Sequence, residues 1–312
     1  MATTNISGAE FEKQTITVLQ LHCLPDFTTG IYAQLTFISL LNSFLSIAAV
    51  FGNALVLIAL RKESSLHPPS KLFLRNLATT DLCVGLISQP LYVALLVTVV
   101  NEHWNICRYL AVVVSITSLI LCAVSLSTLT AISVDRLLGL LLGLRYRQVV
   151  TLRRAYTTVI YFWAASTVSS ITRLFLNSLI RSCYEITAIS LCLVASTFSY
   201  TKIFVKHRLH QNQVQGHVQQ PNQANQLNIA RHRKAVFTTL WLQFTLVACY
   251  LPFIILVTLL VHAEPSSSVS LAWNYTLTLV FLNSTLNPII YCWKIKEVRH
   301  AVKDALRQVV CC

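Results

Sequence analysis

The chain has 312 residues, of which 55% are hydrophobic and only 11% are charged. A soluble domain usually carries about 25% charged residues, so this composition excludes an ordinary soluble protein and indicates a membrane protein. The formal net charge of +13 would suit a nucleic-acid partner, but the basic residues fall in alternate loops between apolar segments. That placement is a membrane topology signal and argues against nucleic-acid binding.

Seven long apolar stretches follow one another along the chain. Each is long enough for a helix that crosses the hydrocarbon core of a bilayer, which takes about 20 residues. Because backbone groups in lipid must form their hydrogen bonds within the segment, we predict an all-α membrane protein with a seven-transmembrane helix bundle over residues 31–292. The stretches are residues 32–60, 72–99, 108–137, 155–176, 184–205, 235–262 and 271–292.

The segment 1–30 is polar and shows no signal peptide, so we expect the first helix to serve as its own insertion signal. Of the 24 Lys and Arg residues, only Lys13, Arg108, Arg173 and Arg181 lie outside the loops on one side of the bundle. This positive-inside bias predicts a multi-pass plasma-membrane protein with an extracellular N-terminus. The basic loops would also contact anionic membrane lipids.

Asn5 opens an N-glycosylation sequon, Asn5-Ile6-Ser7, on the predicted outer side, so we expect a glycoprotein. Two further matches to the pattern begin at Asn274 and Asn283. Asn274 lies at the mouth of the seventh helix, close to the membrane. Asn283 lies inside that helix, so we expect it to be unmodified.

Two segments on the predicted cytoplasmic side differ from the rest of the chain. The loop at about 207–231 is rich in Gln, Asn and His with almost no apolar content, so we predict that it is mobile. Residues 293–312 begin with apolar side chains at near-helical spacing and an otherwise basic face. This pattern predicts a short amphipathic helix on the inner membrane surface. Cys311 and Cys312 at its end are palmitoylation candidates, with two unmodified thiols as the alternative.

Short motifs occur in the predicted helices, in a fixed order. They are Gly52-Asn53, Asn76-Leu77-Ala78-Thr79-Thr80-Asp81, Asp135-Arg136-Leu137, Trp163, Cys249-Tyr250-Leu251-Pro252 and Asn287-Pro288-Ile289-Ile290-Tyr291. Together they make residues 32–310 resemble the rhodopsin-like (class A) G-protein-coupled receptors. Leu137 and Tyr250 depart from the family pattern, which has Tyr and Trp at these places. Trp163 is expected to pack against the second helix.

Asp81 is an ionisable group deep in an apolar helix, where a charge is costly unless it is paired. The resemblance implies that this aspartate binds a sodium ion that favours the inactive state. No other cofactor is expected. The alternative is a polar network around a protonated or water-bridged carboxyl group. The residues at the matching positions of the sodium site are Asp81, Ser125, Asn283, Ser284 and Asn287.

The resemblance also implies a set of activation switches. Arg136 would pair with Asp135 at rest and meet the G protein once it is freed. Pro252 and Pro288 remove backbone hydrogen bonds and kink their helices, and Tyr250 would lie beneath the ligand pocket as a packing trigger. The full set is Asp135, Arg136, Tyr200, Tyr250, Pro252, Pro288 and Tyr291.

The second cytoplasmic loop supplies a further contact that the resemblance implies. Leu144 is expected to enter a pocket of the G protein, together with Arg136; anchoring in the lipid interface is the alternative for Leu144. Gly143 replaces the usual Pro of this loop, and Tyr146 is placed to bond Asp135. Many family members have a second contact from Arg136 to an acidic residue at the foot of the sixth helix. The stretch 231–234 contains no acidic residue, so we predict some basal activity.

The outer cysteines are Cys23, Cys107 and Cys183. The resemblance implies a disulfide from the third helix to the second outer loop, which would be Cys107–Cys183. Cys107 lies one helical turn from the usual position, and Cys23–Cys183 and Cys23–Cys107 are the alternatives. The second outer loop, 177–182, is very short, and Cys192 stands where the fifth helix usually has Pro. Both features resemble the melanocortin and cannabinoid receptors.

The upper bundle gives the candidate ligand pocket. Ser118 stands where amine receptors place an aspartate, so a biogenic-amine ligand is not expected. Phe281 stands at the position of the retinal lysine of opsins, and residues 271–292 contain no Lys, which excludes a photopigment. Arg173 and Glu185 either pair with each other or anchor a charged ligand. The candidate lining is Gln89, Tyr92, Ser115, Ser118, Arg173, Glu185, Tyr250, Phe253, Asn274, Leu277 and Phe281.

This mixed aromatic and polar lining suits a small molecule or a short peptide equally. We therefore interpret the chain as a receptor that binds an extracellular ligand and activates a heterotrimeric G protein. The sequence shows no catalytic constellation and no metal-ligand cluster, so an enzyme is not expected. The alternatives are a non-signalling heptahelical scaffold or decoy and a membrane transporter, although no repeat symmetry of the transporter type is visible.

Overall fold

The computed structural model describes residues 23–28, 30–62, 66–172, 175, 178–217, 223–260 and 266–294. The described part is helical and contains no strand. Its elements are α3 (Pro25–Thr28), α4 (Tyr32–Lys62), α5 (Pro68–Cys83), η1 (Val84–Ser88), α6 (Gln89–Val100), α7 (Trp104–Leu142), η2 (Gly143–Arg145), α8 (Tyr146–Val149), α9 (Leu152–Thr172), α10 (Ser178–His217), α11 (Gln223–Leu260) and α12 (Ser267–Lys294). The predicted seven-helix bundle is confirmed, with α5, η1 and α6 forming one continuous span.

The second span contains a π-helical turn, η1, for a local reason. Pro90 has no N–H and cannot donate to the carbonyl of Leu86, so the helix widens just before the proline. Gly85 in this turn lies against α4. Its carbonyl accepts a hydrogen bond from Ser46 Oγ at 2.7 Å. A Cβ at Gly85 would lie 3.0 Å from the Ser46 carbonyl oxygen, so the close approach of the two helices requires glycine.

Within the described residues, five helices are long and apolar enough to cross a membrane by length and composition alone. They are Tyr32–Arg61, Pro68–Val100, Trp104–Val149, Leu179–Lys206 and Gln243–Leu260. α9 and α12 are more polar but pack in the same bundle. The 21 residues of α9 span about 30 Å, the thickness of a hydrocarbon core. The asparagines of α12, Asn274, Asn283 and Asn287, are buried inside the bundle.

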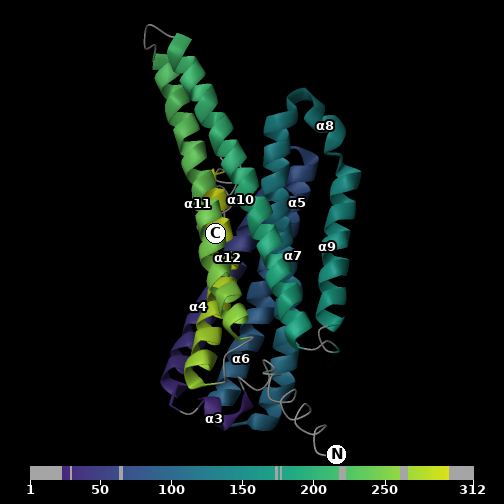
Figure 1. The fold of residues 1–312 in the computed structure, drawn as a ribbon, viewed down its shortest axis with the longest axis vertical. Helices are drawn as coiled ribbons and strands as arrows, with labels where there is room; N and C mark the ends of the chain where they lie inside the picture. Colours follow the sequence, from purple (N-terminus) through teal and green to yellow (C-terminus); the bar gives the residue numbers. More distant parts are fainter. Residues whose placement is uncertain are drawn as a thin grey trace, which may run out of the picture.

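The helices surround α7, which packs against α5, α6, α9 and α10 (Figure 1). On the other side of the bundle, α12 packs against α4 and α11, and the short α3 covers α12. One apolar core cluster joins α4, α5, α7, α10, α11 and α12 around Leu77, Leu129 and Leu246. A second cluster lies between α4, α6, α7 and α12 around Leu96 and Phe281. Every polar group in this core must therefore find a partner within the protein.

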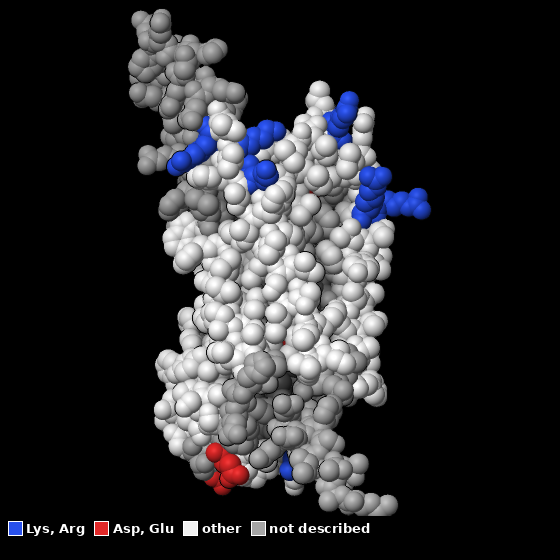
Figure 2. Space-filling view, in the orientation of Figure 1, with Lys and Arg blue, Asp and Glu red and all other residues white. Residues whose placement is uncertain are grey.

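Charge divides the bundle into two ends. We call the end that carries η2 and α8 the basic end and the other the disulfide end. Figure 2 shows most of the Lys and Arg at the basic end, Asp and Glu with a little Lys or Arg at the disulfide end, and an almost uncharged surface between them. The basic residues of this end whose side chains are described are Arg61, Lys71, Arg75, Arg136, Arg145, Arg147, Arg153, Arg154, Lys202, Lys206 and Arg208. An uncharged belt between two charged ends fits a membrane-spanning bundle.

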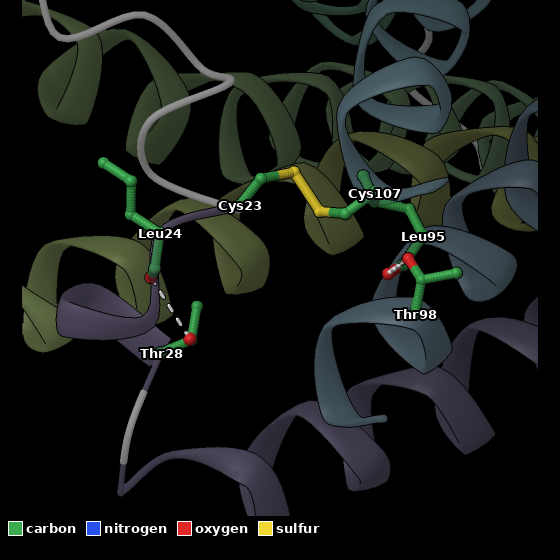
Figure 3. The surroundings of a disulfide bond; sticks show 6 residues. All are labelled: Cys23, Leu24, Thr28, Leu95, Thr98 and Cys107. Carbon is green, nitrogen blue, oxygen red and sulfur yellow. Dashed lines mark hydrogen bonds between the residues drawn. A yellow bond between two sulfur atoms is a disulfide. The ribbon is translucent and has the colours of Figure 1, made fainter. Parts of the chain in front are cut away.

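The predicted Cys107–Cys183 disulfide is wrong. Cys107 in the first turn of α7 bonds instead to Cys23, which precedes α3 (Figure 3). Cys183 is a free, exposed cysteine. The reason is the position of Cys183: α10 already begins at Ser178, so Cys183 lies within a helix and not in a loop that crosses the bundle. The disulfide therefore ties the N-terminal segment to α7.

Two loops differ from the sequence prediction because helices are longer than their apolar stretches. α10 begins at Ser178, so the connection after α9 is 173–177 and not 177–182. α10 also runs to His217 and α11 begins at Gln223, well inside the stretch 207–231 that was predicted as a loop. Polar residues such as Gln continue a helix almost as well as Leu. The helices end beside Gly216 and begin again after Pro221, the two helix breakers of this stretch.

The amphipathic helix and palmitoylation sites predicted in 293–312, and the sequon at Asn5, lie outside the residues whose side chains are described.

Gly52 on α4 faces Pro288 on α12, and this contact gives a test of the packing. A Cβ at Gly52 would lie 3.0 Å from Cβ and Cγ of Pro288, whereas a Cβ at Gly139 would lie 3.8 Å from the nearest atom of Tyr146. We predict that Gly52→Ala lowers the free energy of unfolding by about 1–3 kcal/mol through overpacking. Gly139→Ala is the matched control and should leave stability unchanged or raise it, since Ala favours a helix. Thermal unfolding of the purified protein measures both, and equal melting temperatures for the two variants would contradict the packing.

Candidate functional site

A buried carboxylate lies at the centre of the bundle. Asp81 on α5 is 0% exposed. Its Oδ1 accepts hydrogen bonds from Ser125 Oγ of α7 and Ser284 Oγ of α12, each at 2.8 Å. Its Oδ2 accepts one from Asn287 Nδ2 at 2.8 Å. Hydrogen bonds to a charged group contribute about 1.5–3 kcal/mol each, so these contacts join three helices at one point. We call this set of residues the Asp81 cluster.

Asn283, the fifth residue predicted for this place, lies beside the cluster but not on Asp81. Its Nδ2 is buried and has no hydrogen-bond partner among the described residues. Asn283 and Asn287 line a small cavity of about 10 Å³ that also reaches Tyr200 on α10. A polar cavity of this size is close to what one water molecule needs. The cavity therefore extends from the Asp81 cluster towards Tyr200 and the basic end.

The donor set of this cluster fits a hard cation. It offers a carboxylate, two hydroxyl groups and amide oxygens, and oxygen ligands of this kind suit hard cations. In the described part of the chain, no group of three or more His, Cys, Asp or Glu side chains could hold a metal ion. Any cation at Asp81 would therefore depend on the neutral oxygens of Ser125, Ser284 and the asparagines.

At the basic end, Asp135 has one predicted partner, Tyr146, and one that was not predicted, Ser70. Its Oδ2 accepts a hydrogen bond from Ser70 Oγ of α5 at 2.7 Å. Its Oδ1 accepts one from Tyr146 Oη of α8 at 2.6 Å, as the sequence suggested. The ring of His67 lies 5.0 Å from that of Tyr146. Within the described residues no ion pair joins Asp135 to Arg136, and Ser70 and Tyr146 supply the hydrogen bonds to the carboxylate. The carboxylate thus fixes the loop after α7 to the start of α5.

The loop after α7 presents an isolated apolar side chain. Gly143 has φ +52°, a backbone conformation that glycine adopts easily and that turns the chain sharply. Leu144 follows it and is 98% exposed. Arg136 on the same end is only half-buried. The two residues predicted to contact a partner are therefore accessible at the basic end.

The remaining switch residues occupy the core. Tyr250 on α11 is buried, and Pro252 and Pro288 lie inside α11 and α12, where each interrupts the backbone hydrogen bonding. Tyr200 on α10 is buried in a small cluster with Leu137. Tyr291 belongs to α12, but its side chain lies outside the described residues. Trp163 packs against α5 as predicted and donates a hydrogen bond from Nε1 to Asn76 Oδ1 at 3.0 Å.

A chain of polar contacts between α7, α10 and α11 was missed from the sequence. Ser133 Oγ lies 3.3 Å from Ser196 Oγ, which donates to Gln243 Oε1 at 2.9 Å. Gln243 Nε2 donates to Thr197 Oγ1 at 2.6 Å. We call these four residues the polar clasp. The available signal was Gln243 itself, an amide in an otherwise apolar helix, since polar groups at membrane depth are generally paired. The clasp holds the part of α11 nearer the basic end against α10.

A cavity of about 290 Å³ occupies the half of the bundle nearer the disulfide end. Its floor includes Tyr250 and Val280, and its walls come from α7, α9, α10, α11 and α12. It is close to the lower limit of small-molecule sites, which measure about 300–1,000 Å³. The predicted pocket residues that line it are Ser115, Ser118, Glu185, Tyr250, Phe253 and Leu277.

Four other predicted pocket residues, Gln89, Tyr92, Asn274 and Phe281, do not line the cavity. They lie between α6 and α12 in the core. Tyr92 Oη donates to Asn274 Oδ1 at 2.7 Å, and the rings of Tyr92 and Phe281 are 5.5 Å apart. Asn274 is fully buried, which also leaves no room for a glycan. The orientation of α6 and α12 about their own axes points these four side chains into the core between the two helices and not into the cavity. Arg173 lies outside the described residues, so its predicted pairing with Glu185 stays a prediction.

Comparison with known proteins agrees with this arrangement. The family model described as 7 transmembrane receptor (rhodopsin family) matches residues 52–291. The chain is similar to melanocortin receptor 4 of Danio rerio, with 25% identity over 299 residues. That match covers 91% of this chain and 86% of the fish receptor. All the motifs quoted above, from Gly52 to Tyr291, lie within the range that the family model matches.

The contacts of Asp135 give a second test. We predict that Tyr146→Phe lowers the free energy of unfolding by about 1–3 kcal/mol, because it removes a hydrogen bond to a buried carboxylate. Tyr156→Phe is the matched control, since Tyr156 is an exposed tyrosine of α9 near the same end. Arg136→Gln should also leave the melting temperature near that of the wild type. A larger loss of thermal stability for Arg136→Gln than for Tyr146→Phe would contradict the assignment of the partners of Asp135.

Proposed function

Because the chain belongs to the rhodopsin family of seven-transmembrane receptors, and is thus a G-protein-coupled receptor and not an enzyme, we propose that it binds an extracellular ligand and activates a heterotrimeric G protein. The observation that carries this proposal is the arrangement of three separate sites along the bundle. A cavity lies towards one end, accessible Arg136 and Leu144 lie at the other, and the Asp81 cluster lies between them.

The proposed orientation has the disulfide end outside the cell. Most of the described Lys and Arg residues lie at the opposite end, which the positive-inside rule assigns to the cytoplasm. The Cys23–Cys107 bond supports the same orientation, because disulfides persist in oxidising, extracellular surroundings. Exposed apolar Leu144 then faces the cytosol, where a G protein is available to cover it.

Activation would then require movement of α11 at the basic end. The cavity floor at Tyr250 lies two residues from Pro252, so a ligand in the cavity contacts the helix next to its hinge. An outward swing of α11 below Pro252 must break the bonds of Gln243 to Ser196 and Thr197. A ligand shifts this equilibrium only by as much as it binds the open state better than the closed one.

We also propose that the Asp81 cluster holds a sodium ion in the resting receptor. Asp81, Ser125, Ser284, Asn287 and Asn283 would supply its oxygen ligands. The buried carboxylate and the small polar cavity beside Asn283 support this assignment. A bound cation would supply positive charge to a carboxylate that otherwise has only neutral donors, and so would favour the closed packing of α5, α7 and α12.

The receptor function is tested in cells that carry a panel of G-protein dissociation sensors. Ligands from tissue extract and from a peptide and metabolite library are screened, and ligand-free signal is recorded at high expression. At equal surface expression, Arg136→Ala and Leu144→Asp should each lower the signal at least tenfold. Leu152→Asp, a change of an exposed leucine at the same end, is the matched control and should signal like the wild type.

The competing function is that of a non-signalling heptahelical scaffold or decoy. It predicts that Arg136→Ala and Leu144→Asp change no G-protein readout while the protein still reaches the cell surface. That result, with every sensor and ligand tested, would reject the proposed coupling.

The sodium proposal predicts salt-specific stability. The melting temperature of the purified receptor should rise by several degrees when choline chloride is replaced by sodium chloride at constant ionic strength. Asp81→Asn should abolish this difference, because it removes the only charged ligand of the proposed site. Asp135→Asn, which also neutralises a buried acid of the bundle, should retain it. An equal response of the wild type to both salts would reject the sodium site.

A further inference from the structure

The cavity near the disulfide end reaches the lipid-facing surface of the bundle. Tyr161 on α9 and Tyr184 on α10 both line it, although they are 67% and 53% exposed. Tyr161 lies near the middle of α9, at membrane depth. A cavity whose lining includes exposed side chains on two transmembrane helices is open at the side, towards the bilayer.

The opening lies between α9 and α10. Each of these helices packs against α7, but they make almost no contact with each other. The side chains that face the cavity from the two helices are small at Ala165, Ser169 and Ala188. Small residues leave a passage where larger ones would close the seam.

The chemistry of the cavity selects an uncharged, mainly apolar molecule. Its described lining contains no Lys, Arg or His, so none of the described lining residues offers a cation to bind an acid. The carboxylate of Glu185 also lines it and repels anions. Glu185 already interacts with another group of the protein, so a cationic ligand would have to compete with that partner.

Two neutral polar atoms in the lining are left for a ligand. Ser118 Oγ and Trp273 Nε1 are buried and have no hydrogen-bond partner among the described residues, and both residues line the cavity. An indole N–H can only donate, so it requires an acceptor oxygen. A hydroxyl group both donates and accepts. A buried polar atom without a partner costs about 1–3 kcal/mol, which a ligand with a carbonyl or hydroxyl group would recover.

We propose that the ligand is an uncharged amphiphilic lipid, with a hydroxyl or carbonyl head at Ser118 and Trp273, and that it passes from the bilayer between α9 and α10. This inference rests on the proposed receptor function and names its ligand class. The head group occupies the cavity of about 290 Å³, and the remainder of a long chain extends through the opening into the membrane.

The test uses the full-length receptor in phosphatidylcholine nanodiscs and a photoreactive 1-monoacylglycerol with a diazirine in its acyl chain. After irradiation, the labelled peptides are mapped by mass spectrometry. We expect saturable labelling of cavity residues on α7, α9 and α10 that unlabelled 1-oleoylglycerol lowers at least fivefold. A photoreactive fatty acid and a photoreactive long-chain amine should give no competed labelling. Non-saturable labelling of all lipid-facing helices, or stronger competed labelling by a charged probe, would overturn the proposal.

The passage is tested by closing it. Ala165→Trp places a large side chain in the seam and should lower competed labelling at least fivefold. Ala164→Trp, at the neighbouring exposed position that does not line the cavity, is the matched control and should stay within twofold of the wild type. Ala188→Trp closes the seam from the α10 side and serves if Ala165→Trp fails to fold. Labelling of a folded, closed variant at the wild-type level would overturn the proposed passage.

The head-group site is tested by Trp273→Phe and Ser118→Ala. Each should raise the probe concentration for half-maximal labelling about fivefold to tenfold, the loss that corresponds to one hydrogen bond of about 1–1.4 kcal/mol. Unchanged half-maximal concentrations in both variants would overturn the assigned head-group contacts. The G-protein sensors separate this inference from the proposed function. Intact coupling without competed lipid labelling rejects only the ligand class, whereas competed labelling without any coupling rejects only the receptor function.

Discussion

The structure depends on the buried carboxylate of Asp81. Asp81 lies in the middle of an apolar bundle, where water cannot solvate it, and the protein must supply every partner of its carboxylate. Ser125, Ser284 and Asn287 do so from α7 and α12. Because these donors come from separate helices, the helices cannot shift relative to one another without breaking hydrogen bonds to a charge. A shift of these helices at one end of the bundle is therefore coupled, through the Asp81 cluster, to their packing at the other end.

The two ends have different chemistry on the same framework. At the disulfide end, Cys23–Cys107 ties the N-terminal segment to α7, and a mainly apolar cavity lies beside the hinge at Pro252. The basic end is held by the hydrogen bonds of the Asp135 carboxylate and by the weaker, neutral contacts of the polar clasp at Gln243. Neutral hydrogen bonds contribute only about 0.5–1.5 kcal/mol each, so a ligand of ordinary affinity can shift the balance between closed and open arrangements.

The features that could be predicted from the sequence are those whose alternatives would be energetically most costly, such as a long apolar helix in water or an unpaired charge in lipid. Apolar length predicted the bundle, and the cost of a charge in lipid singled out Asp81 and its neighbours. Features that depend on how a helix is oriented about its own axis, or on the path of a loop, could not be predicted from the sequence. Three outer cysteines allowed several pairings, and only the start of α10 before Cys183 decides among them. Tyr92 and Phe281 looked like pocket residues because composition does not say which way a helix face turns. Gln243 was overlooked because no family motif contains it.

The most direct measurement is the distance between the basic ends of α8 and α11, by pulsed electron paramagnetic resonance. Spin labels are introduced through non-natural amino acids at Val149 and Trp241, two exposed positions at that end. If the Asp81 carboxylate holds the helices together, Asp81→Leu should move the distance distribution towards longer values without any ligand, while the wild type keeps one short population. An unchanged distribution in a folded Asp81→Leu receptor would show that the buried charge does not control the packing of the bundle.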